Sequence, residues 1–127
     1  MKAREFLVKF KNDLEKMKAQ STATVNGFAG LFGKTMSEEV LTVKEKELVA
    51  IGIAVAKQCE PCIILHVQKC LDAGASREEI LEASGVAVMM SGGPAYTHIP
   101  MVIDAIDELE SSPVSYTHLT LPTILLV

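Results

Sequence analysis

The feature that most constrains the fold is the spacing of the apolar residues, which recur every three or four positions along most of the chain. The clearest example lies near the N-terminus, where segment 2–18 carries an apolar stripe made of Phe6, Leu7, Phe10, Leu14 and Met17. This period is typical of an amphipathic helix, whereas a half-buried strand alternates every second residue. Because no alternating pattern of that kind occurs in the sequence, the chain is predicted to be all-α.

Two capping boxes indicate where helices begin. Thr42 is followed by Glu45, and Ser76 is followed by Glu79. In such a pair each side chain binds the backbone N–H of the other residue, so the free N–H groups of the first turn are satisfied. The helices that these boxes open are predicted to run to about Lys57 and Met90.

Proline and glycine mark the limits of the remaining helices. Pro61 suits the first turn of a helix, and Gly74 suits the left-handed residue that follows its last turn. Segment 22–35 is predicted to be a further helix, although three glycines interrupt its apolar stripe. After a break at Gly92–Pro94, a last helix is predicted from the stripe Ile99, Val102, Ile103, Ile106 and Leu109. We therefore expect a compact bundle of five to six helices.

Burial can also be predicted from these patterns. Residues 51–56 read IGIAVA and are apolar all round, so we expect them to be buried on every side. Met89, Met90 and Cys70 are expected to fill the core. Together with the stripes of the first two helices, this apolar surface exceeds what one small domain can cover, which predicts a homo-oligomer.

Composition excludes several functions. Aromatic residues make up 5% of the chain and Trp is absent, which argues against stacking on single-stranded nucleic acid. Residues 1–34 are basic, but acidic residues interrupt them, so we interpret them as a solvated helix face and expect neither a nucleic-acid nor a membrane partner. The longest apolar run, Leu48 to Ala56, is shorter than the ~20 residues that span a bilayer. Three cysteines without a secretory signal predict a cytoplasmic protein.

The C-terminal segment differs from the rest of the chain. Val114 to Val127 contains no charged residue, and its string VSYTHLTLPT looks like an in-frame translation of a transposon-type sequencing adapter. We therefore predict a single helical domain over residues 1–113 and a non-native tail over residues 114–127, which contributes no residue to any candidate site.

The chemistry-bearing residues lie within the segment KQCEPCIILH. Cys59 and Cys62 form a Cys-x-x-Cys motif, and His66 follows one helical turn later. At about 100° per residue, the three side chains project from one face of a helix. The helix start favours a thiolate at Cys59, whereas the negative charge of Glu60 disfavours one nearby. A pair at this spacing can close to a disulfide, and His66 can accept or donate a proton.

Two structural interpretations of the cysteines compete with a redox site. They could be buried and inert, or they could bind zinc with Cys70 as a further ligand. Cys59 and Cys70 would be about 16 Å apart along a helix, which one ion with bonds of about 2.3 Å cannot bridge. We therefore expect no metal and no cofactor. His98 is expected to be a hydrogen-bonded residue of a helix face.

A family resemblance adds to this interpretation. The residues that carry it are Glu47, Cys59, Cys62, His66, Gly74, Ser76 and Glu79. Their spacing resembles the carboxymuconolactone decarboxylase-like family and, within it, the alkylhydroperoxidase D branch. The resemblance covers about residues 20–110. It implies an all-helical fold, assembly into a trimer or hexamer, and thiol-dependent reduction of hydroperoxides by an external dithiol or thiol, with a site made of Glu47, Cys59, Cys62 and His66.

The chain departs from that branch in one respect that concerns the site. Alkylhydroperoxidase D proteins have a second His between the cysteines, where this chain has Glu60 and Pro61. They are also longer, with a duplicated helical layout. The resemblance therefore does not identify which peroxide is reduced or which electron donor restores the thiols. Glu47 itself is either a general acid or base at an apolar face or an ordinary first-turn acid stabilised by the helix dipole.

Three functions follow from these residues. The first is a thiol peroxidase or disulfide oxidoreductase, in which Cys62 attacks the peroxide, Cys59 closes the disulfide and Glu47 orients His66. The helix dipole favours Cys59 as the thiolate whereas His66 favours Cys62, so these two roles can be exchanged. The second is a lactone decarboxylase that uses His66 and Glu47 without redox chemistry. The third is a non-enzymatic redox-sensing protein.

Overall fold

The structure is a computed structural model that describes residues 2–110, and every regular element in this range is an α-helix. The helices are α1 (Ala3–Gln20), α2 (Thr22–Met36), α3 (Val43–Ala56), α4 (Glu60–Asp72), α5 (Arg77–Ser91), α6 (Gly93–Tyr96) and α7 (Ile99–Glu110). The all-α prediction is confirmed, and the short helix α6 is the element that the sequence did not indicate. The predicted tail, residues 114–127, lies outside the described residues.

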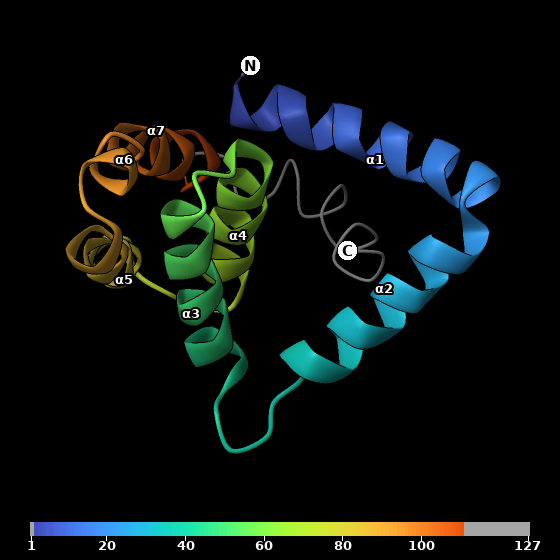
Figure 1. The fold of residues 1–127 in the computed structure, drawn as a ribbon, viewed down its shortest axis with the longest axis horizontal. Helices are drawn as coiled ribbons and strands as arrows, with labels where there is room; N and C mark the ends of the chain where they lie inside the picture. The colour runs from blue at the N-terminus through green and yellow to red at the C-terminus, as the bar shows by residue number, and fades with distance from the viewer. Residues whose placement is uncertain (1, 111–127) are drawn as a thin grey trace.

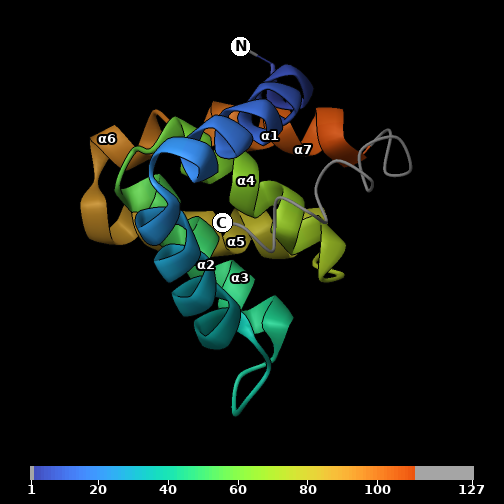
Figure 2. The ribbon, with the colours of Figure 1, turned by 90° about the vertical axis from the view of Figure 1, so that its right-hand side faces the viewer.

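Helices α3, α4, α5 and α7 form the bundle, and α1 and α2 form an arm beside it (Figure 1). Helix α3 packs against both α4 and α5, and α4 packs against α7. Helix α1 crosses α4 and α7, and α2 then returns toward the start of α3, as the two views together show (Figure 2). Among residues 2–110, no helix combines the length and the apolar character that crossing a membrane requires.

The core lies where α3, α4, α5 and α7 meet. Its fully buried side chains are Ile51, Val55, Ile63, Val67, Cys70, Ile80, Val102, Ile106 and Leu109. Burying a side chain the size of Val or Ile contributes about 1.5–3 kcal/mol, so this cluster is the main source of stability for the bundle. Cys70 belongs to the core, as its sequence context predicted.

The turn between α3 and α4 is short and consists of residues 57–59. Beyond the last turn of α3, the N–H of Gln58 donates to the carbonyl of Val55, and the N–H of Cys59 donates to the carbonyl of Ala54. These two bonds form a Schellman motif, which requires a left-handed residue at Gln58. Gln58 has φ +56°, although glycine is the usual residue there. Cys59 therefore completes the end of α3 and caps the start of α4.

The turn between α4 and α5 repeats this motif. The N–H groups of Gly74 and Ala75 donate to the carbonyls of Leu71 and Cys70, and Gly74 has φ +89°. The predicted left-handed glycine is confirmed. Both predicted capping boxes are also present, at the starts of α3 and α5.

Two predictions of burial are wrong. Ile53, within the IGIAVA segment, is 53% exposed, and Met89 and Met90 are 72% and 74% exposed. Ile53 of α3 and Met90 of α5 face an open surface between the two helices and not the core. This surface is an apolar groove of about 430 Å³ between α3 and α5, lined by Leu48, Val49, Gly52, Ile53, Ala56, Ala83, Val86, Ala87 and Met90. We call this the α3–α5 groove.

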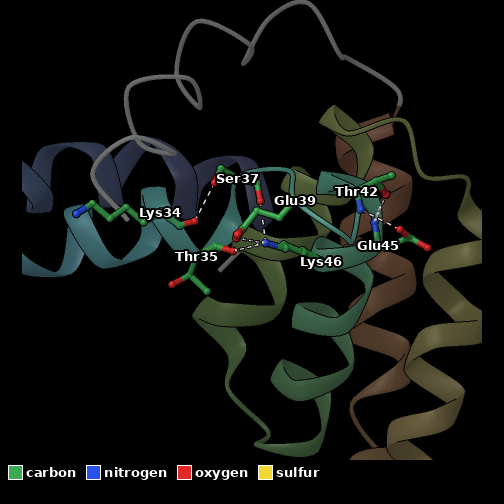
Figure 3. A network of polar contacts seen from close by, with 7 residues as sticks. All are labelled: Lys34, Thr35, Ser37, Glu39, Thr42, Glu45 and Lys46. Carbon is green, nitrogen blue, oxygen red and sulfur yellow. Dashed lines mark hydrogen bonds and ion pairs between the residues drawn. The ribbon is translucent and has the colours of Figure 1, made fainter.

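A lysine attaches the end of α2 to the first turn of α3 (Figure 3). The Lys46 ammonium group donates to the carbonyls of Thr35 and Ser37, each at 2.7 Å, and lies 3.4 Å from a carboxylate oxygen of Glu39. A cation at this position is favourable because the last carbonyls of a helix have no partner within the helix. These contacts fix the arm to α3 at the position next to Glu47.

Candidate functional site

The cysteine pair lies at the start of α4. Cys59 and Cys62 form a disulfide with their Cα atoms 5.2 Å apart, and both residues are partly buried. Cys59 is the N-cap residue, and its Sγ accepts the backbone N–H of Cys62 at 3.2 Å. Pro61 occupies the first turn, where the missing N–H carries no cost. In the reduced protein, the same N–H and the helix dipole would stabilise a thiolate at Cys59.

Glu47 of α3 and His66 of α4 form a hydrogen-bonded pair in which the carboxylate is buried and the imidazole is partly buried. His66 Nδ1 lies 2.7 Å from Glu47 Oε1, and Glu47 is only 4% exposed. An ionised carboxylate only accepts hydrogen bonds, so with Glu47 ionised the proton lies on Nδ1 and Nε2 is free to accept another. This is the geometry of a general base held in one tautomer by a carboxylate.

Two further side chains, which were not singled out from the sequence, lie near this pair: Phe32 contacts His66, and Lys69 contacts Phe32. The ring of Phe32, from α2, stacks on the ring of His66 with centroids 6.2 Å apart and an angle of 27° between the planes. The ammonium group of Lys69 lies 5.0 Å from the centroid of the same Phe32 ring. Lys69 had one sequence signal, because it lies three residues after His66 and seven after Cys62, on the same helix face. Phe32 had none beyond its place on an apolar stripe.

Burial changes the proton affinity of the groups around the pair. Desolvation lowers the pKa of Lys69 to about 8, although the negative charges of Glu47 and Asp72 oppose this effect. Burial also raises the pKa of the Cys70 thiol to about 12, and the charge of Glu47 acts in the same direction. Cys70 therefore stays a thiol at neutral pH and donates to the backbone carbonyl of Glu47 at 3.3 Å. It is a structural residue, distinct from the Cys-x-x-Cys pair.

The structure brings the sequence-predicted site residues to adjoining turns of two helices. Cys59 is bonded to Cys62, His66 follows Cys62 by one turn of α4, and α3 presents Glu47 to His66. His98 lies elsewhere and is hydrogen-bonded as expected, with its Nδ1 2.8 Å from the carbonyl oxygen of Pro94, but it lies in the turn between α6 and α7 and not on a helix face. In the part of the chain that the structure describes, no three His, Cys, Asp or Glu side chains are arranged to hold a metal ion.

Two solved structures share the fold. One is a carboxymuconolactone decarboxylase family protein of Legionella pneumophila, with a TM-score of 0.80 and 34% identity, which matches over 84% of this chain and 95% of that protein. The other is a family protein of Thermotoga maritima for which involvement in an antioxidative response has been suggested. It has a TM-score of 0.77 and 27% identity, over 84% of this chain and 92% of that protein.

Sequence comparison gives the same result. An uncharacterized protein encoded in the cox locus of Paracoccus denitrificans is 32% identical over 87 residues, which cover 68% of this chain and 78% of the relative. An uncharacterized protein of Cupriavidus necator is 28% identical over 89 residues, covering 70% and 79% respectively. Residues 23–99, which include all four predicted site residues, match the model of the carboxymuconolactone decarboxylase family. The chain belongs to the carboxymuconolactone decarboxylase family.

Proposed function

We propose that the protein is a thiol-dependent peroxidase that reduces hydroperoxides at the Cys59–Cys62 pair and is restored by an external dithiol or thiol. The observation that carries this proposal is that His66 lies one turn of α4 beyond the disulfide-forming pair and is hydrogen-bonded to the buried carboxylate of Glu47 from α3. The antioxidative role suggested for the Thermotoga maritima relative agrees with it. An inert structural disulfide would not require a hydrogen-bonded Glu47–His66 pair beside it.

The first half of the reaction consumes the peroxide. His66 accepts the proton of the Cys62 thiol, and the resulting thiolate attacks one oxygen of the hydroperoxide. The O–O bond breaks, Cys62 is oxidised to a sulfenic acid, and the departing alkoxide takes a proton and leaves as the alcohol. Glu47 keeps the Nδ1 proton of His66 in place, so Nε2 is the atom that accepts and returns the proton.

The second half restores the thiols. The Cys59 thiolate attacks the sulfenic sulfur of Cys62, the disulfide forms, and hydroxide leaves and is protonated to water. An external dithiol then reduces the disulfide by exchange and is itself oxidised. The N–H of Cys62, which donates to Cys59 Sγ, would stabilise Cys59 as the thiolate released in that exchange.

Turnover with hydroperoxide is the direct test. The reduced protein should lose two thiols per chain on mild peroxide treatment while Cys70 stays free, and it should consume peroxide catalytically with a lipoyl, thioredoxin-like or glutathione donor. Peroxide loss and thiol content are the two measurements. Loss of two thiols without turnover under any donor would favour a redox-sensing protein, and decarboxylation of a lactone by protein whose cysteines are blocked would favour the decarboxylase alternative.

We further propose that the protein works as a homo-oligomer, a trimer or hexamer. The support is the apolar surface that the single chain leaves open, namely the α3–α5 groove and the exposed Phe28 and Leu31 of α2. Patches of this kind on a folded protein are typical of interfaces.

This assembly predicts a measurable mass. At micromolar concentration, light scattering should give a mass three or six times that of the chain, and Ile53→Glu in the α3–α5 groove should lower it. Ile53→Glu is informative because the side chain is exposed in the single chain, so the substitution should not disturb the core. A monodisperse monomer in the unsubstituted protein would contradict the proposal.

A further inference from the structure

Helix α2 contributes one aromatic ring to the site, that of Phe32. The ring stacks on the imidazole of His66, with centroids 6.2 Å apart and 27° between the planes, and the ammonium group of Lys69 lies 5.0 Å from its centroid. Phe32 therefore contacts two side chains of α4, although α2 belongs to the arm and not to the bundle (Figure 1). This contact joins the arm directly to the candidate site.

The imidazole of His66 needs a second contact to acquire a fixed orientation. Its hydrogen bond to Glu47 Oε1, 2.7 Å from Nδ1, fixes one corner of the ring. The last torsion of a histidine side chain has broad preferences, so the ring can still turn about the line through that bond. Such a turn displaces Nε2, the atom that exchanges the proton in the proposed reaction. A ring stacked on the face of the imidazole, as Phe32 is, opposes this turn.

Core packing alone holds α2 weakly. Among the residues of this helix, all of which the structure describes, Val25 alone is buried. Phe28 is 51% exposed and Leu31 is 61% exposed, while Phe32 is partly buried. The position of the Phe32 ring therefore depends on what holds the two ends of α2.

Lys46 holds the end of α2 that lies nearest to Phe32. Its ammonium group donates to the carbonyls of Thr35 and Ser37, which follow Phe32 by three and five residues (Figure 3). The side chain of Lys46 is 16% exposed, so these charge-assisted bonds are partly shielded from water. Lys46 is also the neighbour of Glu47 in the chain. One turn of α3 thus provides both supports of His66, the carboxylate directly and the aromatic ring through α2.

We propose that Phe32 is a positioning residue of the site: its ring, held in place by Lys46, fixes the plane of the His66 imidazole and thereby the direction of Nε2. The proposal rests on the proposed function, because it assigns a role within that reaction. A base that is displaced by about 1 Å can lose up to about 10²-fold in rate without any change of fold. The stacked ring also covers one face of the imidazole, so it should limit the access of reagents to His66.

The first test observes the imidazole itself, in the oxidised protein and without peroxide. In nuclear magnetic resonance, stacking on Phe32 should displace the ring signals of His66, and this displacement should be lost in Phe32→Leu and kept in Phe32→Tyr. Diethyl pyrocarbonate should modify His66 several-fold faster in Phe32→Leu, with His98 as the internal reference. Phe28→Leu is the matched control, because it removes a ring one turn earlier in α2, and it should change neither measurement.

The role of Lys46 is tested in the same way. Lys46→Met removes the bonds to the carbonyls of Thr35 and Ser37, so it should change the His66 signals and reactivity in the same direction as Phe32→Leu. Lys46→Arg keeps the charge and should restore both toward the original. An unchanged His66 in folded Lys46→Met would overturn the part assigned to Lys46.

The second test measures the rate of thiol oxidation under limiting peroxide. Phe32→Leu should be about 10-fold slower than the unsubstituted protein, and Phe32→Tyr should keep most of the rate. In a His66→Ala background, Phe32→Leu should cause no further loss, because Phe32 acts through His66. A merely structural role would lower the melting temperature and leave the rate below that temperature unchanged.

Three results would overturn the proposal: unchanged His66 signals in Phe32→Leu, an unchanged rate although the stack is lost, or an equal loss of rate with and without His66. If the Phe32 and Lys46 variants do not fold, the unsubstituted protein decides. Magnetisation transfer between the ring protons of Phe32 and His66 would support the proposal, and its absence would overturn it. If the unsubstituted protein does not consume peroxide, the proposed function is wrong, while the His66 signals still decide whether Phe32 orients the ring.

Discussion

Cys62→Ser is expected to abolish sulfenic acid formation and hydroperoxide reduction, because it removes the thiol that lies one helical turn from His66. Cys59→Ser is the matched partner. It should still form the sulfenic acid but should not resolve it, since the sulfur that closes the disulfide is missing. A sulfenate-selective probe, applied after one equivalent of peroxide, should therefore label Cys59→Ser strongly and Cys62→Ser not at all. Cys70→Ser is the control and should behave as the unsubstituted protein does, because Cys70 is a buried thiol outside the pair.

The opposite pattern of sulfenate labelling would mean that Cys59 attacks the peroxide and Cys62 closes the disulfide. The N–H bond from Cys62 to Cys59 Sγ and the start of α4 both favour a thiolate at Cys59. If Cys59→Ser prevents sulfenate formation and Cys62→Ser accumulates it, Cys59 is the residue that attacks the peroxide. If neither variant alters peroxide consumption, the redox interpretation of the site is wrong.

His66→Ala is expected to slow thiol oxidation by about 10²–10⁴-fold, the usual contribution of a positioned general base. Glu47→Gln should produce a smaller loss of the same kind, because an amide can still contact Nδ1 but no longer stabilises one tautomer by charge. Both effects are measured as the rate of sulfenate or disulfide formation under limiting peroxide. The loss in His66→Ala should diminish at high pH, where the thiol ionises without help.

His98→Ala is the control for this prediction. His98 lies in the turn between α6 and α7 with its Nδ1 bonded to the carbonyl of Pro94, so its removal should leave the rate unchanged. A rate in His66→Ala within a few-fold of the original, in protein that melts at the same temperature, would remove His66 from the mechanism. The Glu47–His66 pair would then be a structural contact between α3 and α4.

The features that the sequence predicted well are those that depend on a few neighbouring residues. The capping box of Thr42 and Glu45, the left-handed Gly74 and the cysteine motif at a helix start all arise from interactions within about one helical turn. The chemistry of the Cys59–Cys62 pair and of His66 could be proposed for the same reason, because these residues share one short helix. The pairing of Glu47 with His66 came from the family resemblance and not from spacing.

The features that were missed or wrong depend on how separate helices meet. Nothing in the sequence places Phe32 of α2 over His66 and Lys69, since that contact follows from the path of the arm. Ile53 was expected to be buried because its segment is apolar all round, yet only part of α3 is covered. An apolar sequence shows that a surface avoids water, but it does not show whether the same chain or another one covers it.

Cys59 both completes the end of α3 and caps the start of α4. The number of residues between Glu47 and Cys59 therefore determines where the Glu47 carboxylate lies relative to α4. Gln58 and Cys59 of this turn take part in the hydrogen bonds that end α3 and begin α4, so the turn cannot accommodate a change in the length of α3. We therefore expect an insertion or deletion within α3 to rotate the preceding part of that helix about its axis. One residue added to a helix turns everything before it by about 100° and shifts it by about 1.5 Å. A single insertion between Glu47 and Ala54 would therefore carry the carboxylate to a different side of α3 from His66, while leaving both cysteines in place. The site therefore requires the spacing of twelve positions from Glu47 to Cys59 as strictly as it requires the residues themselves.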